Sequence, residues 1–184
     1  MNSIDQQVIF QLSQWLEAGK QCWLCTIIST FGSSPRPVGS LLACNVDGQY
    51  CGSLSGGCIE DDLREDIFNG KIAKGKPEKV SYGVAVEDVL KLGLPCGGQL
   101  QVIIEPLNKT HIAIYKELAL SVKNRTLITR VVDLKSGKTH LQNAKQGKAL
   151  TITEETMQHT YGPSFRLLLV GAVQVSYYLC EMAQ

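Results

Sequence analysis

The stretch of sequence that decides how this chain folds runs from Gly32 to Glu60. It reads GSSPRPVGS over residues 32–40, LLACNVDGQYCG over 41–52 and SLSGGCIE over 53–60. The two outer segments are rich in glycine, serine and proline, where a core would need branched apolar residues. Such residues specify turns and let backbone N–H groups approach a ligand closely. We therefore expect the function to lie in these two segments.

The middle segment has the pattern of a β-hairpin. Ser40–Cys44 and Gln49–Gly52 are strand candidates on either side of Asp47-Gly48, a dipeptide that favours tight hairpin turns. After Gly56-Gly57, apolar residues recur three or four positions apart, which predicts a helix that ends at Gly70. A hairpin followed by a glycine-rich turn and a helix is therefore expected in this part of the chain.

The flanking sequence alternates between helical and strand patterns. Upstream, a helix is expected from Ile4 to Leu16 and a buried strand at Trp23–Thr30. The elements expected downstream are a strand at Leu100–Ile104 stopped by Pro106, a helix at His111–Val122, a hairpin formed by Thr126–Leu134 and Lys138–Leu141, and a short strand at Leu150–Thr153. The basic segment Lys71–Lys79 is interpreted as a solvated loop. These patterns predict an α/β domain over residues 1–160, with a mixed β-sheet, or a largely antiparallel one, flanked by helices.

The last segment has the order of a dinucleotide-binding unit. Arg166–Val170 is a strand candidate, a turn at Gly171 follows, and the run to Gln184 predicts the start of a helix. Val173 stands where the fingerprint needs its second glycine, and no acidic residue follows at ribose-binding spacing, so neither NAD nor FAD is expected. Residues 165–184 are interpreted as a remnant of a Rossmann-like domain. The unpaired strand edge predicts self-association to a homo-oligomer.

The composition excludes several classes of protein. The formal net charge of +1 indicates no nucleic-acid partner, and no apolar run is long enough to cross a membrane. The N-terminus lacks the pattern of a signal peptide, and the seven cysteines are odd in number and irregularly spaced, which favours a reducing cytoplasm. Cys22 and Cys25 form a CxxC pattern within a strand, so we expect them to face opposite sides as buried structural thiols.

Three motifs in order resemble the XdhC/CoxI family, the accessory factors of xanthine dehydrogenase and related molybdenum hydroxylases. They are GSSPRPVG at 32–39, SGGCIE at 55–60, and LPCGG at 94–98 with Glu105-Pro106. The resemblance implies a cytoplasmic maturation factor without turnover of its own. Such factors bind the molybdenum cofactor, support its sulfuration by a cysteine desulfurase and pass it to the apo molybdenum hydroxylase. Family members usually carry a complete Rossmann-like C-terminal domain, of which residues 165–184 are expected to be only the opening strand and turn.

The cofactor implied by the resemblance is anionic and flat, either molybdopterin or its dinucleotide form. Arg36 offers a planar fork for phosphate or oxo groups. The backbone N–H groups of Gly56 and Gly57 precede a helix, where anions are favoured. The predicted cofactor-binding residues are Ser33, Ser34, Arg36, Gly39, Ser55, Gly56, Gly57, Cys58, Glu60, Cys96, Gly97 and Gly98.

Several alternatives stay open at the level of the sequence. Cys58 at a helix start would have a lowered pKa, but the acidic residues from Glu60 onward oppose this effect, so its role could be molybdenum contact, sulfur handling or packing. A second hypothesis is a thiol-dependent sulfur-transfer or redox enzyme that uses Cys58 and Cys96. A third is a partner-binding or non-functional fragment. Glu60 and Glu105 could form an acid/base pair, although helix capping and a strand end explain them more simply. Cys58 and Cys96 lack the further ligands that zinc needs.

Overall fold

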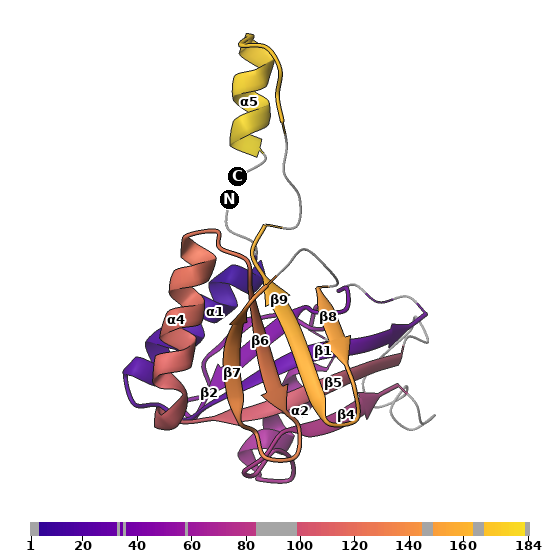
Figure 1. Ribbon diagram of the computed structural model, residues 1–184. Coiled ribbons are helices and arrows are strands. Elements are labelled where there is room, and N and C mark those ends of the chain that lie inside the picture. Colours follow the sequence, from indigo (N-terminus) through magenta and orange to yellow (C-terminus); the bar gives the residue numbers. More distant parts are fainter. Residues whose placement is uncertain are drawn as a thin grey trace.

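The computed structural model describes residues 4–32, 34, 36–57, 59–83, 99–144, 149–163 and 168–182. These residues form two antiparallel sheets with helices packed on them, so the expected α/β class is confirmed (Figure 1). The strands are β1 (Cys22–Phe31), β2 (Leu41–Asn45), β3 (Tyr50–Gly52), β4 (Glu78–Tyr82), β5 (Gln99–Leu107), β6 (Ile128–Asp133), β7 (Thr139–Asn143), β8 (Leu150–Ile152) and β9 (Thr156–Tyr161). The helices are α1 (Ile4–Glu17), α2 (Glu60–Phe68), α4 (Ile112–Lys123) and α5 (Gln174–Met182), with a 3-10 turn η1 (Lys109–His111) before α4.

The larger sheet has the strand order β3-β2-β1-β5-β4, and all its described pairs are antiparallel. The expected mixed or largely antiparallel sheet is therefore antiparallel, and it is divided into two sheets rather than one. Side chains alternate along β1, so that Cys22 and Leu24 face α1 and α4 while Trp23 and Cys25 face α2. The predicted opposite orientation of Cys22 and Cys25 is confirmed.

The smaller sheet has the order β7-β6-β9-β8 and lies against one face of the larger sheet (Figure 1). The expected hairpin of β6 and β7 and the expected short strand β8 are present. Strand β9 is not expected from the sequence, because its polar and apolar residues alternate without a turn signal as strong as those of the other hairpins. Its buried residues, Met157, His159 and Tyr161, face the larger sheet.

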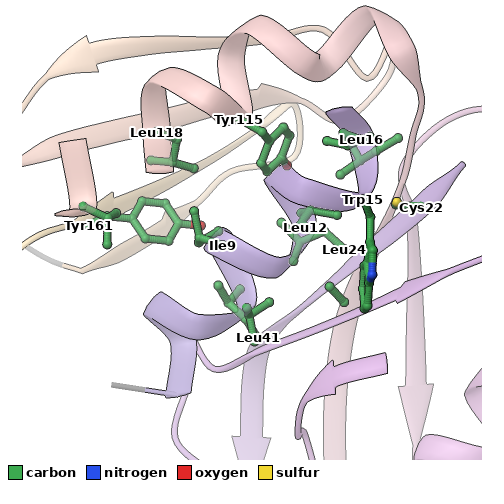
Figure 2. Close-up of a cluster of buried hydrophobic side chains, with 14 of the residues drawn as sticks. Ile9, Leu12, Trp15, Leu16, Cys22, Leu24, Leu41, Tyr115, Leu118 and Tyr161 are labelled. Carbon is green, nitrogen blue, oxygen red and sulfur yellow. The ribbon is translucent and has the colours of Figure 1, made fainter. Parts of the chain in front are cut away.

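Helices α1 and α4 pack against each other and cover one end of the larger sheet. Figure 2 shows Ile9, Leu12 and Leu16 of α1 among the side chains of α4, the sheet and Tyr161. The spacing of the apolar residues of α1 follows the helical period, which explains why this helix is predictable. No helix among the described residues is long and apolar enough to cross a bilayer.

A buried ion pair joins the two sheets at their centre. Arg130 of β6 donates to both carboxylate oxygens of Glu105 on β5, at 2.6 and 3.0 Å, and to the hydroxyl of Tyr115 at 3.1 Å. Neither Arg130 nor Glu105 has more than 2% of its side chain exposed. The possible acid/base pair of Glu60 and Glu105 is therefore not formed, because Glu105 is held by Arg130 and Glu60 by its own loop.

Two boundaries in the larger sheet differ from the sequence prediction. The segment interpreted as a basic loop includes the start of β4, which pairs with β5 from Glu78 onward. Strand β5 does not stop before Pro106 but runs to Leu107. Its pairing with β4 ends at Ile104, so beyond that point the strand tolerates a residue without an N–H group.

The C-terminal segment differs from the rest of the chain. Helix α5 forms where a helix is expected, and it has no buried residue. Leu168 and Val170 are 85% and 93% exposed and are not part of a strand, so the expected strand is absent over 168–170. No parallel neighbour is available to this stretch in the described part of the chain, which leaves nothing to pair with. Residues 166 and 167 lie outside the described residues.

Candidate functional site

The topology of the larger sheet brings the first two sequence motifs to the same end of its strands, called the edge below. Strand β1 ends at Phe31, where the segment with Arg36 begins, and β3 ends at Gly52, where the segment before Glu60 begins. Strand β5 starts at Gln99, which pairs with Phe31 at the same edge. The predicted site residues Ser33, Cys58, Cys96, Gly97 and Gly98 lie outside the described residues. The described members come from loops that leave the same edge of the sheet.

The carboxylate of Glu60 organises the loop that follows β3. It accepts hydrogen bonds from the backbone N–H groups of Leu54, Ser55, Gly57 and Ile59, and from the hydroxyls of Ser53 and Ser55. Burial alone would raise the pKa of this carboxyl, but the hydrogen bonds from Ser55, Leu54 and Ser53 outweigh it and lower the pKa to about 2. Glu60 is therefore a charged anchor around which the loop closes.

This closure changes the interpretation of the two glycines. The N–H group of Gly57 donates to Glu60 at 3.1 Å, and that of Gly56 donates to Ser53 Oγ at 3.0 Å. Both amide groups are thus already engaged inside the loop rather than left free for an anion. The side chain of Glu60 occupies the position that sequence reasoning gives to a ligand. Gly56 and Gly57 both have positive φ and are exposed, which explains why glycine stands there.

Arg36 places a positive charge at this edge, and the hydrogen bonding of its guanidinium group is incomplete. Its Nη2 atom lies 3.4 Å from Asp5 Oδ1, while its Nε atom is buried without a hydrogen-bond partner among the described residues. Asp5 is shared, because it also accepts from the backbone N–H of Leu41 at 3.1 Å. The hydroxyl of Ser34 donates to the carbonyl of Arg36 at 2.8 Å and shapes the loop. The Arg36 guanidinium therefore keeps unused donor capacity next to the loops.

Gly39 connects the Arg36 loop to both sheets. Its N–H donates to the carbonyl of Ile27 on β1 at 2.9 Å, and its φ of +93° favours glycine. His159 of β9 lies against it, with Nε2 at 3.4 Å from the position that a Cβ atom would take. Burial, followed by the nearby charge of Arg130, lowers the pKa of His159 to about 3, so this imidazole is neutral.

Sequence reasoning misses three residues that shape this edge. At Gly52 a Cβ atom would lie 2.3 Å from the carbonyl oxygen of Leu41, so only glycine allows the Glu60 loop to start there. In the sequence Asp5 is only a residue of the first expected helix, and His159 stands in no recognisable ligand spacing. Gly52 ends strand β3 and needs a positive φ, but no local sequence signal distinguishes it from the glycine of an ordinary turn.

The four described cysteines of the larger sheet are structural. Burial raises the pKa of Cys22 and of Cys44 to about 12 and that of Cys25 well above its usual range. Cys51 is half-buried, and burial raises its pKa too. Thiols in these environments stay protonated and are poor nucleophiles. These four cysteines therefore provide no activated thiol.

Two cavities lie away from the Gly32–Glu60 stretch. One of about 510 Å³ lies at the opposite end of the larger sheet, between the start of α4 and the turn that joins β6 to β7. The other, of about 560 Å³, lies between the two sheets and is lined by Ile28, Ile103 and Ile152 among others. No residue between Gly32 and Glu60 lines either cavity.

Comparison with known proteins supports the resemblance seen in the sequence. Residues 15–83 match the model of the XdhC and CoxI family, which includes the first two motifs. The protein named molybdenum cofactor insertion chaperone PaoD from Escherichia coli K12 is 30% identical over 92 residues, which are 50% of this chain and 28% of PaoD. A Bacillus subtilis 168 protein, named as a probable xanthine dehydrogenase subunit, is 28% identical over 130 residues, 68% of this chain and 38% of that protein.

A solved structure has a similar fold. The crystal structure of a xanthine dehydrogenase from Bacillus halodurans superposes with a TM-score of 0.60 at 24% identity. The match covers 84% of this chain and 53% of that one. The aligned part of this chain thus spans about a quarter to a half of the length of these relatives.

Proposed function

We propose, from the premise that residues 15–83 of this chain match the XdhC and CoxI family, that the protein is a molybdenum-cofactor-binding accessory factor. It holds the cofactor, as molybdopterin or its dinucleotide form, and passes it to an apo molybdenum hydroxylase of the xanthine dehydrogenase type. It supports sulfuration of the cofactor by a cysteine desulfurase and has no turnover of its own. It acts in the cytoplasm and needs neither NAD nor FAD.

The observation that carries this proposal is the incomplete pairing of Arg36 within the family match. A guanidinium with a buried, unpartnered Nε and a single long contact to Asp5, among the described residues, suits an anionic ligand. The phosphate of the cofactor is such a ligand. The Glu60 loop has the different role of a rigid wall, since its donors are used internally. Binding therefore centres on Arg36, with the loops around it giving shape.

The predicted residues that the structure does not describe complete the proposed site. Ser33 adjoins the described loop of Arg36, and Cys58 precedes Ile59 in the Glu60 loop. Cys96, Gly97 and Gly98 directly precede Gln99, whose partner Phe31 ends β1. In the proposal these residues add soft and backbone contacts to the cofactor.

The C-terminal segment is proposed to mediate self-association. Its apolar side chains are exposed, from Leu168 at 85% to Met182 at 82%, and α5 contributes none to the core. Exposed apolar surface on this scale marks an interaction site. Residues 165–184 are proposed to be the start of a Rossmann-like domain. Light scattering should show a concentration-dependent increase in mass, and a strictly monomeric protein at high concentration would reject this part.

The main test is direct binding of the released cofactor. The purified protein is mixed anaerobically with molybdenum cofactor released from a molybdoenzyme and passed over a size-exclusion column. We expect molybdenum and the pterin to co-elute with the protein, and to reactivate an added apo molybdenum hydroxylase. A folded sample that elutes without either would reject the proposed function for this chain.

A further inference from the structure

The cavity between the two sheets has the features of a small-molecule site. Its volume of about 560 Å³ lies within the range of about 300–1,000 Å³ that is typical of ligand pockets. The larger sheet contributes Ile28 and Ile103 to its walls, and the smaller sheet contributes Leu134 and Ile152. This cavity, called the slot below, thus has apolar walls from two facing sheets, and mostly apolar walls are typical of ligand pockets.

The charged residues that line this slot are Glu78, Lys79 and Glu154. Lys79 of β4 and Glu154 of the turn between β8 and β9 both line it and are exposed. Within the described residues neither side chain makes an ion pair or a hydrogen bond. The neighbouring acids differ, since Glu78 accepts from the N–H of Ala73 and Glu155 pairs with Lys135. Among the described residues, the slot therefore has one free carboxylate and one free ammonium group.

A bulge in β1 connects this slot to the Arg36 edge. The register of β1 against β5 shifts between Ile27 and Ser29, so Ile28 is the extra residue and contributes to the cavity wall. Bulges re-aim side chains and are frequent beside functional sites. The backbone of Ile27 exchanges hydrogen bonds with Gly39 and Ser40 of the Arg36 loop. The wall of the slot and the Arg36 loop are thus linked through two adjacent residues of β1, Ile28 and Ile27.

We propose that the slot between the sheets binds a flat amino-substituted heterocycle of the pterin class. Glu154 accepts hydrogen bonds from the adjacent N–H groups of its aminopyrimidinone edge, and Lys79 donates to its oxygen atoms. A carboxylate matches two neighbouring N–H donors as it does in its pairs with arginine. The choice of a pterin rests on the proposed function, whereas the apolar walls and the two free charges come from the described residues of the cavity itself.

The experiment uses neopterin, a fluorescent pterin without phosphate, titrated with the full-length protein. We expect saturable quenching for the wild type. Glu154→Gln should weaken binding by about tenfold, since it removes a charged acceptor, and Lys79→Met should weaken it less. Ile152→Trp, which places a ring in the slot, should abolish binding. Glu155→Gln and Lys76→Met are the matched controls and should bind as the wild type does.

The outcomes separate this inference from the proposed function. No saturable neopterin binding, or equal effects of Glu154→Gln and Glu155→Gln, would overturn the pterin site. If the released cofactor co-elutes with the protein but the Glu154→Gln variant binds neopterin normally, the inference fails and the proposed function stands. If neopterin binds in a Glu154-dependent way while the cofactor does not co-elute, the slot is confirmed and the proposed function fails. Unchanged thermal unfolding of Glu154→Gln and Ile152→Trp ensures that a loss of binding is not a loss of fold.

Discussion

Arg130 and Arg36 carry the same guanidinium group, but the protein uses them in opposite ways. Arg130 is fully buried between the sheets, where it makes two short bonds to Glu105 and one to Tyr115. Arg36 is partly exposed at the sheet edge, where its one ionic contact among the described residues, to Asp5, is 3.4 Å long. Both Nε atoms are buried without a hydrogen-bond partner in the described part of the chain. The difference lies in how much of each charge is already neutralised.

This difference separates a structural charge from one that is available to a ligand. A buried arginine with a bidentate carboxylate has its charge compensated, and removing either member leaves an uncompensated charge in the core. The protein loses little stability when an arginine with one long contact is removed from a surface loop. The position in the fold, rather than the residue type, therefore decides which arginine can bind an anion. Substitutions at Arg130 and at Arg36 test this contrast, and one at Glu60 tests the loop beside Arg36.

The largest effect is expected at the buried pair. Arg130→Ala leaves Glu105 buried without its partner and should lower the free energy of unfolding by about 3–5 kcal/mol. Urea unfolding followed by circular dichroism measures this loss. The double variant Arg130→Met with Glu105→Leu should recover most of it, because it removes both charges together. If Arg130→Ala costs less than about 1 kcal/mol, the pair does not hold the sheets together.

The second effect concerns the Glu60 loop and depends on pH. The pKa of Glu60 is lowered from 4.5 to about 2 in the folded protein, so its contribution to stability is present above about pH 4.5 and is lost as the pH falls toward 2. The corresponding free energy is about 3 kcal/mol. Glu60→Gln should lower the stability by this order at pH 7 and flatten the stability profile between pH 4.5 and 2.

Glu65→Gln is the matched control for this experiment, because Glu65 lies exposed on the same helix. Its unfolding profile should follow that of the wild type across the whole pH range. An unchanged acid profile in Glu60→Gln would show that the six hydrogen bonds of the loop do not stabilise the charged carboxylate.

The periodic elements of the fold are predictable from the sequence. Helix α1, the hairpin of β2 and β3, and helix α4 have clear apolar spacing or a strong turn signal, and the structure confirms them. Strand β9 and the start of β4 are missed because their alternation is weak and a lysine-rich segment resembles a loop. The ion pair that links the two sheets joins Arg130 and Glu105, which are 25 residues apart. No local pattern reports such a pairing.

The site is predictable as a region but not in its bonding. Glycine, serine and proline mark the two loops correctly, because the backbone conformation of a turn depends on the residue types within it. The sequence does not indicate that Glu60 takes up the N–H groups of its own loop. It also does not indicate that Asp5, 31 residues before Arg36, partly neutralises it. Both facts depend on distances that only the folded chain defines.

The most direct test of the central claim compares Arg36→Ala with Arg125→Ala, since Arg125 is an exposed loop arginine outside the proposed site. Cofactor affinity and urea unfolding are measured on the same samples. We predict that Arg36→Ala weakens binding of released molybdenum cofactor by about tenfold or more, with a loss of stability below about 1 kcal/mol. Arg125→Ala should change neither quantity. Equal cofactor affinity in the two variants would contradict the assignment of Arg36 as the anion-binding residue.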